Sequence, residues 1–147
     1  NRLDLARKLG ATHIINTEFS DPKSKINEIL KNDKLDVFID NTGITSIIEM
    51  GYELTDYKGR IILVGVPKKG NNINIFSLPL HFGKTISGSH GGETNPDLDI
   101  PRYMKLLSKN KFKLDTLISD RFNLKDINNA ITSMRKGNTA GRILIDL

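Results

Sequence analysis

The sequence predicts an α/β fold built on a parallel sheet. Two apolar runs, 37–39 and 61–66, each lead into a turn that contains glycine, and a helix-length segment separates them. Buried strands of a parallel sheet have continuous Val, Ile and Leu runs of this kind. Ligands of such sheets bind outside the carboxyl ends of the strands, so residues 41–43 and 65–67 are the first candidates for a functional site.

The first part of the chain is predicted as helix, strand, helix and strand. Residues 3–9 carry apolar side chains on one face at helical spacing, and Gly10 is well placed to end that helix. A short strand is expected over 13–15. A second helix is expected to begin near Pro22, because proline is tolerated in a first helical turn. The strand at 37–39 follows it.

The middle of the chain is predicted to complete a crossover and add strands. Thr45 or Ser46 can cap a helix that crosses over to a strand at 60–66, which the turn Lys58-Gly59 precedes. The later elements are expected to be an edge strand, a short helix and a last strand, at 73–76, 78–82 and 85–86.

The last third is predicted as a separate segment. Residues 93–100 form a loop rich in Pro, Asp and Asn, which marks the best candidate for a boundary. Pro101 is expected at a helix start. The rest is expected to be an irregular or extended stretch, a helix and a closing strand, at 114–122, 126–136 and 142–147.

Composition argues against several classes of partner. The net charge is +5, but the 22 Lys and Arg are spread among 17 acids, without a block of five like charges or interleaved aromatics, so we expect no nucleic-acid partner. No apolar run approaches the roughly 18 residues of a membrane span. The absence of cysteine excludes a thiolate metal site within these residues. We expect a cytoplasmic protein and, since the chain begins at Asn1 in a helical pattern, a piece of a longer one.

Ordered stretches along the chain resemble the C-terminal half of a medium-chain, zinc-type alcohol dehydrogenase. They read RLDLARKLGAT, VFIDNTG, GRIILVGVP, GKTISGS and LISDRFNLKDINNAITSMRKGNTAGRILIDL. The resemblance implies a partial Rossmann-type, doubly wound parallel sheet whose first two strands are missing, plus C-terminal helices and a closing strand. It implies a partial dinucleotide-binding domain at 1–92 and, at 93–147, a segment that returns toward an absent catalytic domain.

The resemblance also implies that the chain binds NAD or NADP, through residues that position the cofactor and none that transfers a proton. Residues 41–43 would lie beside the adenosine ribose and the nicotinamide. Residues 64–66 would line the ring, since apolar side chains hold one face while a glycine lets a backbone amide reach the carboxamide. Arg142 is weighed equally against a surface arginine. The candidate residues are Arg2, Asn41, Thr42, Gly43, Val64, Gly65, Val66, Ser89, His90 and Arg142.

By the same resemblance, the parent enzyme would transfer a hydride between an alcohol or aldehyde substrate and the nicotinamide. Zinc is expected only in the missing N-terminal domain, and a homodimer is expected through the edge strand at 73–76. Two alternatives stay open: a zinc-free quinone or enoyl reductase of the same superfamily, and a non-catalytic nucleotide-binding module. The chain alone is expected to be inactive.

Overall fold

The computed structural model describes residues 2–109, 114–137 and 139–147, which fall into two compact units. One unit is formed by residues 20–94, and the other combines residues 1–19 with residues 95–147. The assignment of 1–92 to cofactor binding and of 93–147 to a returning segment is a functional division, and it stays a prediction.

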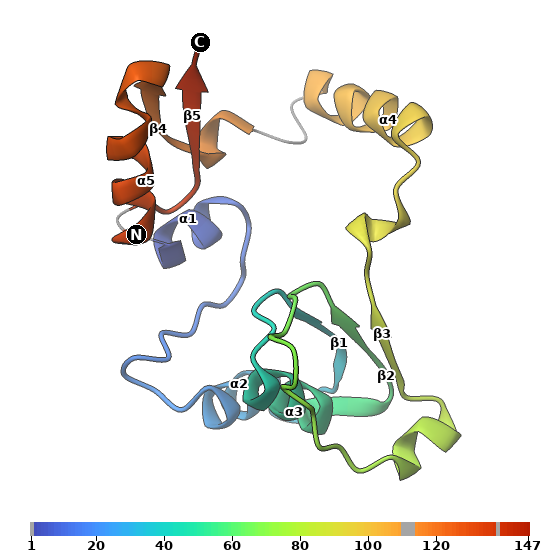
Figure 1. Cartoon of the computed structure of the whole chain (residues 1–147). Coiled ribbons are helices and arrows are strands. Elements are labelled where there is room, and N and C mark those ends of the chain that lie inside the picture. The colour runs from blue at the N-terminus through green and yellow to red at the C-terminus, as the bar shows by residue number, and fades with distance from the viewer. Residues whose placement is uncertain (1, 110–113, 138) are drawn as a thin grey trace. The chain divides into compact units, whose positions relative to one another are not determined.

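The unit of residues 20–94 is built on a three-stranded parallel sheet. Its strands are β1 (Leu35–Asp40), β2 (Thr55–Leu63) and β3 (Thr85–Gly88), which lie in the order β1-β2-β3 (Figure 1). Because all pairs are parallel, the three carboxyl ends meet at one edge of the sheet. The predicted α/β fold with a parallel sheet is therefore confirmed.

The helix α3 (Thr45–Leu54) connects β1 to β2 and packs against both strands. Its buried side chains include Ile48 and Tyr52, which are 2% and 4% exposed and belong to the same core as Ile61 of β2. A Cβ atom on Gly51 would overlap the ring of Phe38, so glycine at this position lets the helix approach the sheet.

The predicted cap of α3 is wrong. The N-cap residue is Ile44, and no side chain caps the helix. Both predicted cap residues lie inside the first helical turn, where a hydroxyl can no longer take the cap position. The turn before the helix is held instead by Thr42, whose hydroxyl accepts a hydrogen bond from the Ile44 amide at 3.1 Å.

The strand β2 begins earlier and ends earlier than predicted. The pair Lys58-Gly59, expected as a turn, lies inside the strand. A register shift explains the difference, because Leu35 pairs with Thr55 while Val37 pairs with Arg60, so the extra residues of β2 bulge between two paired positions. Residues 64–66 lie beyond the strand, in the loop at its carboxyl end.

Two predicted strands, at 13–15 and at 73–76, form no ladder in the part of the chain that the structure describes. An apolar alternation becomes a strand only where a neighbour pairs with it. The segment at 73–76 is held by side chains of α3 instead. The Tyr52 hydroxyl donates to the Phe76 carbonyl at 2.8 Å, and the Asn74 amide donates to the Glu49 carboxylate at 2.7 Å.

The sheet leaves apolar side chains of β1 open to solvent. Among the described residues β1 pairs only with β2, so it forms an edge of the sheet. Ile39 is 63% exposed and Val37 is 37% exposed, whereas Phe38 lies half-buried against α3.

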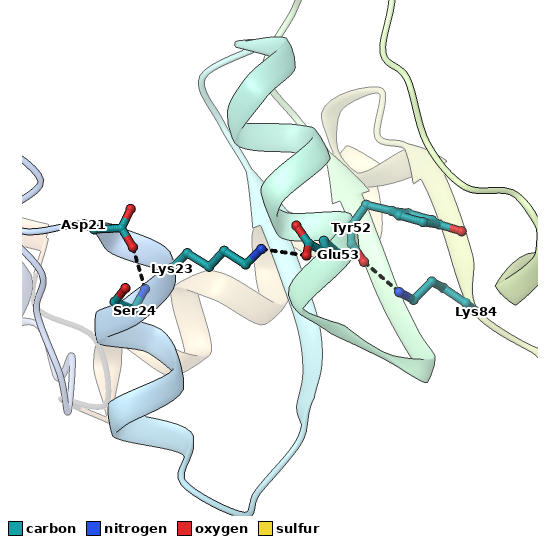
Figure 2. Close-up of polar contacts among 6 residues, drawn as sticks. All are labelled: Asp21, Lys23, Ser24, Tyr52, Glu53 and Lys84. Atoms are coloured by element: carbon teal, nitrogen blue, oxygen red, sulfur yellow. Dashed lines mark hydrogen bonds and ion pairs between the residues drawn. The ribbon is translucent and has the colours of Figure 1, made fainter.

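The helix α2 (Pro22–Leu30) begins at Pro22, as predicted. Its N-cap is Asp21, whose carboxylate accepts a hydrogen bond from the Ser24 amide at 2.8 Å (Figure 2). An exposed ion pair of 2.6 Å joins Lys23 of α2 to Glu53 of α3. The predicted short helix at 78–82 is present as η1 (Leu78–Phe82).

The second unit contains another parallel pair of strands. β4 (Ile118–Asn123) pairs with β5 (Arg142–Asp146), and the intervening helix α5 (Ile127–Arg135) packs against both strands and buries Ala130. The predicted closing strand and the helix before it are therefore confirmed. The remaining elements of this unit are α1 (Arg2–Lys8), α4 (Pro96–Ser108), η3 (Leu114–Leu117) and η4 (Leu124–Asp126).

The helix α4 starts earlier than predicted. Pro101, expected at the helix start, lies inside it, and Pro96 occupies the first turn instead. A proline there loses no hydrogen bond, because the first amides of a helix have no intrahelical partner. The Asp99 carboxylate accepts a hydrogen bond from the amide of the N-cap residue Asn95 at 3.0 Å, which further stabilises this start.

Candidate cofactor site

Asp40 organises the turn at the carboxyl end of β1. It is the last residue of the strand and only 1% exposed. One carboxylate oxygen accepts hydrogen bonds from the Thr42 hydroxyl at 2.6 Å and from the Thr42 amide at 3.1 Å. The other accepts the Gly43 amide at 2.9 Å. The carboxylate of Asp40 thus fixes the turn of residues 41–43.

These hydrogen bonds determine the ionisation of the buried acid. Burial by itself would raise the pKa of Asp40, because it disfavours the charged form. The hydrogen bonds from Thr42 and Gly43 favour the carboxylate and outweigh burial, so the pKa of Asp40 lies below its usual value. Asp40 is therefore a carboxylate at neutral pH.

Backbone hydrogen bonds join the three strand ends. The Asp40 carbonyl accepts the amides of Val64 and Gly65, at 2.7 and 3.0 Å. The Leu63 carbonyl accepts the Ser89 amide at 2.9 Å. Asp40 therefore holds its own turn through its side chain and the loop after β2 through its backbone.

Gly43 and Gly65 allow the two loops to touch. A Cβ atom on Gly65 would lie 2.5 Å from the Thr42 amide nitrogen and would overlap the Gly43 amide nitrogen. A Cβ atom on Gly43 would lie 2.6 Å from the Val66 carbonyl carbon, and the φ angle of Gly43 is +68°. Neither position has room for a side chain.

This packing changes the reason for a glycine at position 65. Glycine at this position was expected to let a backbone amide reach the carboxamide of the cofactor, and in the structure the amide of Gly65 itself donates to the Asp40 carbonyl. The missing side chain serves the approach of the two loops. The place of Gly65 in a cofactor site stays a prediction.

A cavity of about 730 Å³ opens at the carboxyl ends of β2 and β3. Its volume lies in the range of small-molecule and cofactor sites, and it combines apolar walls with a few polar groups, as those sites do. It brings together several of the predicted residues with others that were not predicted. The predicted ones are Val64, Gly65, Val66, Ser89 and His90, and the others include Ile48, Asn71, Asn72, Ile73 and Glu93.

The cavity presents both apolar and polar side chains to a ligand. Val64 and Val66 are 49% and 88% exposed, so their side chains are open to a ligand. Ser89 is half-buried, and its hydroxyl accepts the Gly92 amide at 3.1 Å, which leaves the hydroxyl hydrogen for another acceptor.

The turn of residues 41–43 adjoins this cavity through the contact of Gly43 with Val66. The side chain of Asn41 is exposed. The Thr42 hydroxyl donates to Asp40 and accepts from Ile44, so its hydrogen is already engaged. Thr42 therefore shapes the turn, and a cofactor contact by its hydroxyl stays a prediction.

The two predicted arginines belong to the other unit. Arg2 begins α1, and its guanidinium lies near Gly137. Arg142 begins β5 and is exposed, and its carbonyl accepts a hydrogen bond from the Ser119 hydroxyl at 3.2 Å. The cofactor contacts assigned to Arg2 and Arg142 stay predictions.

Two residues of this region that were not predicted, Asp40 and Glu93, differ in the sequence signal that they carry. The predicted strand ended at residue 39 and Asp40 was given no role, although an acid directly before Asn-Thr-Gly is typical of a side chain that bonds to its own turn. Glu93 lines the cavity with a φ angle of +53°, directly after two glycines whose φ angles are also positive. The positive φ angle of Glu93 has no local sequence signal, because residues other than glycine rarely adopt it.

A second cavity, of about 610 Å³, lies beside α3 and the amino end of β3. Lys84, 5% exposed, borders it, and its Nζ donates to the Tyr52 carbonyl at 2.6 Å while lying 4.3 Å from the centroid of the Tyr52 ring (Figure 2). Burial lowers the pKa of Lys84, an effect that the charge of Asp56 opposes. The cavity is distant from the strand ends where parallel sheets bind ligands.

The described residues contain no group of three or more His, Cys, Asp or Glu side chains placed to hold a metal ion. The expected zinc site outside this chain therefore stays a prediction. In the part of the chain that the structure describes, no helix is both long and apolar enough to cross a membrane.

A parallel sheet with glycine turns and a cavity at its carboxyl edge is the arrangement of a nucleotide-binding α/β domain. The model of the zinc-binding dehydrogenase family matches residues 1–109, so the chain belongs to this family. The resemblance to the C-terminal part of a zinc-type alcohol dehydrogenase is confirmed.

Known relatives agree with this assignment. The chain is 28% identical to alcohol dehydrogenase-like 1 of Arabidopsis thaliana, over 98% of its own length and 38% of that protein. It is 34% identical to the crystal structure of benzyl alcohol dehydrogenase from Acinetobacter calcoaceticus, with a TM-score of 0.85, covering 98% of this chain and 40% of that one. An E. coli alcohol dehydrogenase complexed with NADH shares the fold, at 22% identity and a TM-score of 0.82, covering 99% of this chain and 41% of that one. The chain thus spans about two fifths of the length of its relatives.

Proposed function

We propose that this chain is the cofactor-binding part of an NAD(P)-dependent oxidoreductase that transfers a hydride between an alcohol and nicotinamide. The observation that carries the proposal is the cavity at the carboxyl ends of β2 and β3, which gathers residues 64–66 with Ser89 and His90. Family membership and the NADH held by a protein of the same fold support it.

The residues of this chain bind and orient the cofactor. Val64 and Val66 offer an apolar wall to one face of the ring, and Ser89 and His90 offer polar groups to its carboxamide. The nicotinamide itself supplies the chemistry when bound, because its C4 accepts a hydride from the alcohol carbon. A ring held in one orientation presents one face to the substrate, which is the contribution of this chain to the reaction.

The groups that act on the substrate are proposed to lie outside this chain. No residue of the cavity is placed in a proton-transfer role, and the zinc ligands are expected in the part by which the relatives exceed this chain in length. The purified 147-residue chain is accordingly expected to show no turnover, and measurable alcohol oxidation by it would contradict this proposal.

The test titrates NADH and NADPH into the protein at its full natural length and follows cofactor fluorescence. We expect saturable binding, and a loss of about tenfold or more in affinity for Val64→Asp, because a carboxylate would replace the apolar wall. Tyr57→Asp places the same charge on an exposed position of β2 and serves as the matched control. Absence of binding to the unaltered protein would contradict the proposal. Assays with alcohols and with quinones then separate an alcohol dehydrogenase from a zinc-free reductase.

We propose in addition a cytoplasmic homodimer that acts on small alcohols or aldehydes. The segment at 73–76 supports the dimer, since it has no ladder partner among the described residues and Phe76 is 71% exposed. Light scattering should give twice the monomer mass for the full-length protein and the monomer mass for Phe76→Asp. A monomeric unaltered protein would contradict the dimer alone.

A further inference from the structure

We propose that Asp40 is a positioning residue that sets the distance between the turn of residues 41–43 and the loop of residues 64–66, which lines the cavity proposed for the nicotinamide. The inference rests on the proposed function, because it concerns the same cofactor. Its basis is that one buried residue bonds to both loops: its carboxylate to residues 41–43 and its carbonyl to residues 64 and 65.

The carboxylate is suited to this role because all three groups around it are donors. The amides of Thr42 and Gly43 and the Thr42 hydroxyl point at its two oxygens, at 2.6 to 3.1 Å. An ionised carboxylate only accepts hydrogen bonds. An asparagine of the same shape would turn an amide group toward at least one of these donors, so the turn could keep only part of its hydrogen bonds.

A change in the turn is transmitted to the cavity by direct contact. Gly43 lies against the backbone of Val66, and Gly65 lies against the backbone of Thr42 and Gly43, without room for even a methyl group. When the turn moves outward, the loop of residues 64–66 loses its support. Since Val64 and Val66 line the cavity, the wall offered to the ring changes with it.

The main variant is Asp40→Asn in the protein at its full natural length. We expect NADH binding to weaken about tenfold, and binding of ADP-ribose, which lacks the nicotinamide, to weaken about threefold or less. Asp36→Asn removes the same charge from an exposed position of the same strand and should leave both affinities unchanged. Equal losses for NADH and ADP-ribose, or no loss of NADH affinity in a folded Asp40→Asn protein, would overturn the inference.

A second pair of variants decides the question if Asp40→Asn does not fold. Thr42→Val removes the hydroxyl that donates to Asp40 at 2.6 Å, and Thr42→Ser keeps it. We expect NADH binding about threefold weaker for Thr42→Val and restored for Thr42→Ser, and equal NADH affinities for the two would overturn the inference. An unaltered protein that binds neither NADH nor ADP-ribose refutes the proposed function, and the role of Asp40 with it. If the unaltered protein binds NADH and ADP-ribose, and the variants bind them with the same affinities as the unaltered protein, the proposed function stands and only the role of Asp40 is refuted.

Discussion

The two sides of the candidate site are built differently. At the ends of β1 and β2, residues 41–43 and 64–66 interlock around a buried acid, and neither Gly43 nor Gly65 has room for a side chain. After β3, residues 90–94 are exposed and include the short helix η2 (Gly91–Glu93), in which a Cβ atom on Gly91 would meet nothing within 4 Å.

The difference shows two ways in which glycine serves a binding site. At position 65 it is required by close approach, because backbone atoms of the neighbouring loop occupy the space of a side chain. At position 91 it is required by conformation alone, since its φ angle is +63° in open surroundings. One side of the cavity is therefore rigid by packing, and the other is held by a few local hydrogen bonds.

The largest effect is expected for Gly65→Ala. The methyl group would overlap the Gly43 amide and force the loops apart, which should cost about 3 kcal/mol in the free energy of unfolding. Urea denaturation measures it. Gly88→Ala, in a strand position where a Cβ atom meets nothing within 4 Å, is the control, and we expect about 0.5 kcal/mol or less there. Similar losses at both positions would remove the distinction between the two sides.

The next prediction concerns the pH dependence of stability, and it applies to the side of the site formed by residues 41–43 and 64–66. The pKa of Asp40 is lower in the folded protein than in the unfolded chain, where it is about 3.9. The ionised carboxylate therefore stabilises the folded protein above about pH 3.9. This stabilisation is lost as the pH falls through the pKa of the folded state. Asp40→Asn should cost about 2 kcal/mol at pH 7, the scale of hydrogen bonds to a charged group. Urea denaturation should show this difference shrinking below about pH 4. If the unaltered protein and Asp40→Asn differ in stability by the same amount at pH 7 and below about pH 4, Asp40 does not stabilise the fold as an ionised carboxylate.

A smaller effect is expected for Gly91→Ala. Only the left-handed backbone resists the substitution, which costs about 1 kcal/mol for a residue with a Cβ atom. Thermal unfolding measures the loss. Gly43→Ala combines a φ angle of +68° with a blocked Cβ position, so it should lower the free energy of unfolding by clearly more than Gly91→Ala. A larger loss for Gly91→Ala would contradict the difference between the two sides of the site.

The smallest effect is expected for Ser89→Ala. It removes the acceptor of the Gly92 amide in an exposed part of the loop, where water replaces the bond, so we expect a loss of about 0.5 kcal/mol. Glu93→Gly tests the same loop in the opposite direction. It should raise the free energy of unfolding by a few tenths of a kcal/mol. Glycine removes the cost of the left-handed backbone at this position, but it loses more conformational entropy on folding, which offsets most of that gain. A loss above 2 kcal/mol for Ser89→Ala would show that the loop is as tightly held as the strand ends.

The sequence predicted those elements whose cause is local. Pro22 and its cap Asp21 start α2 as expected, and the apolar run at 37–39 forms the middle of β1. The absence of two predicted strands from the described part of the chain has causes outside the segments concerned. Residues 73–76 alternate like a strand and residues 13–15 were expected as a short one, but neither segment finds a ladder partner among the described residues.

The candidate site was predicted to the extent that topology determines it. The rule that ligands bind at the carboxyl ends of parallel strands selected residues 41–43 and 65–67, and residues 65–67 line the cavity. The hydrogen bonds between Asp40 and its own turn had a local sequence signal, which is the acid directly before Asn-Thr-Gly. The engagement of the Gly65 amide by Asp40 depends on a contact between distant segments, which composition and spacing do not reveal.

The open side of β1 has a consequence for handling the protein. Ile39, 63% exposed, lies on a strand that forms an edge of the described sheet. An apolar edge strand with unpaired amides and carbonyls is a template for the addition of further strands, including those of other copies. The 147-residue chain, purified by itself, should aggregate in proportion to its concentration, and a lysine in place of Ile39 should keep it in solution.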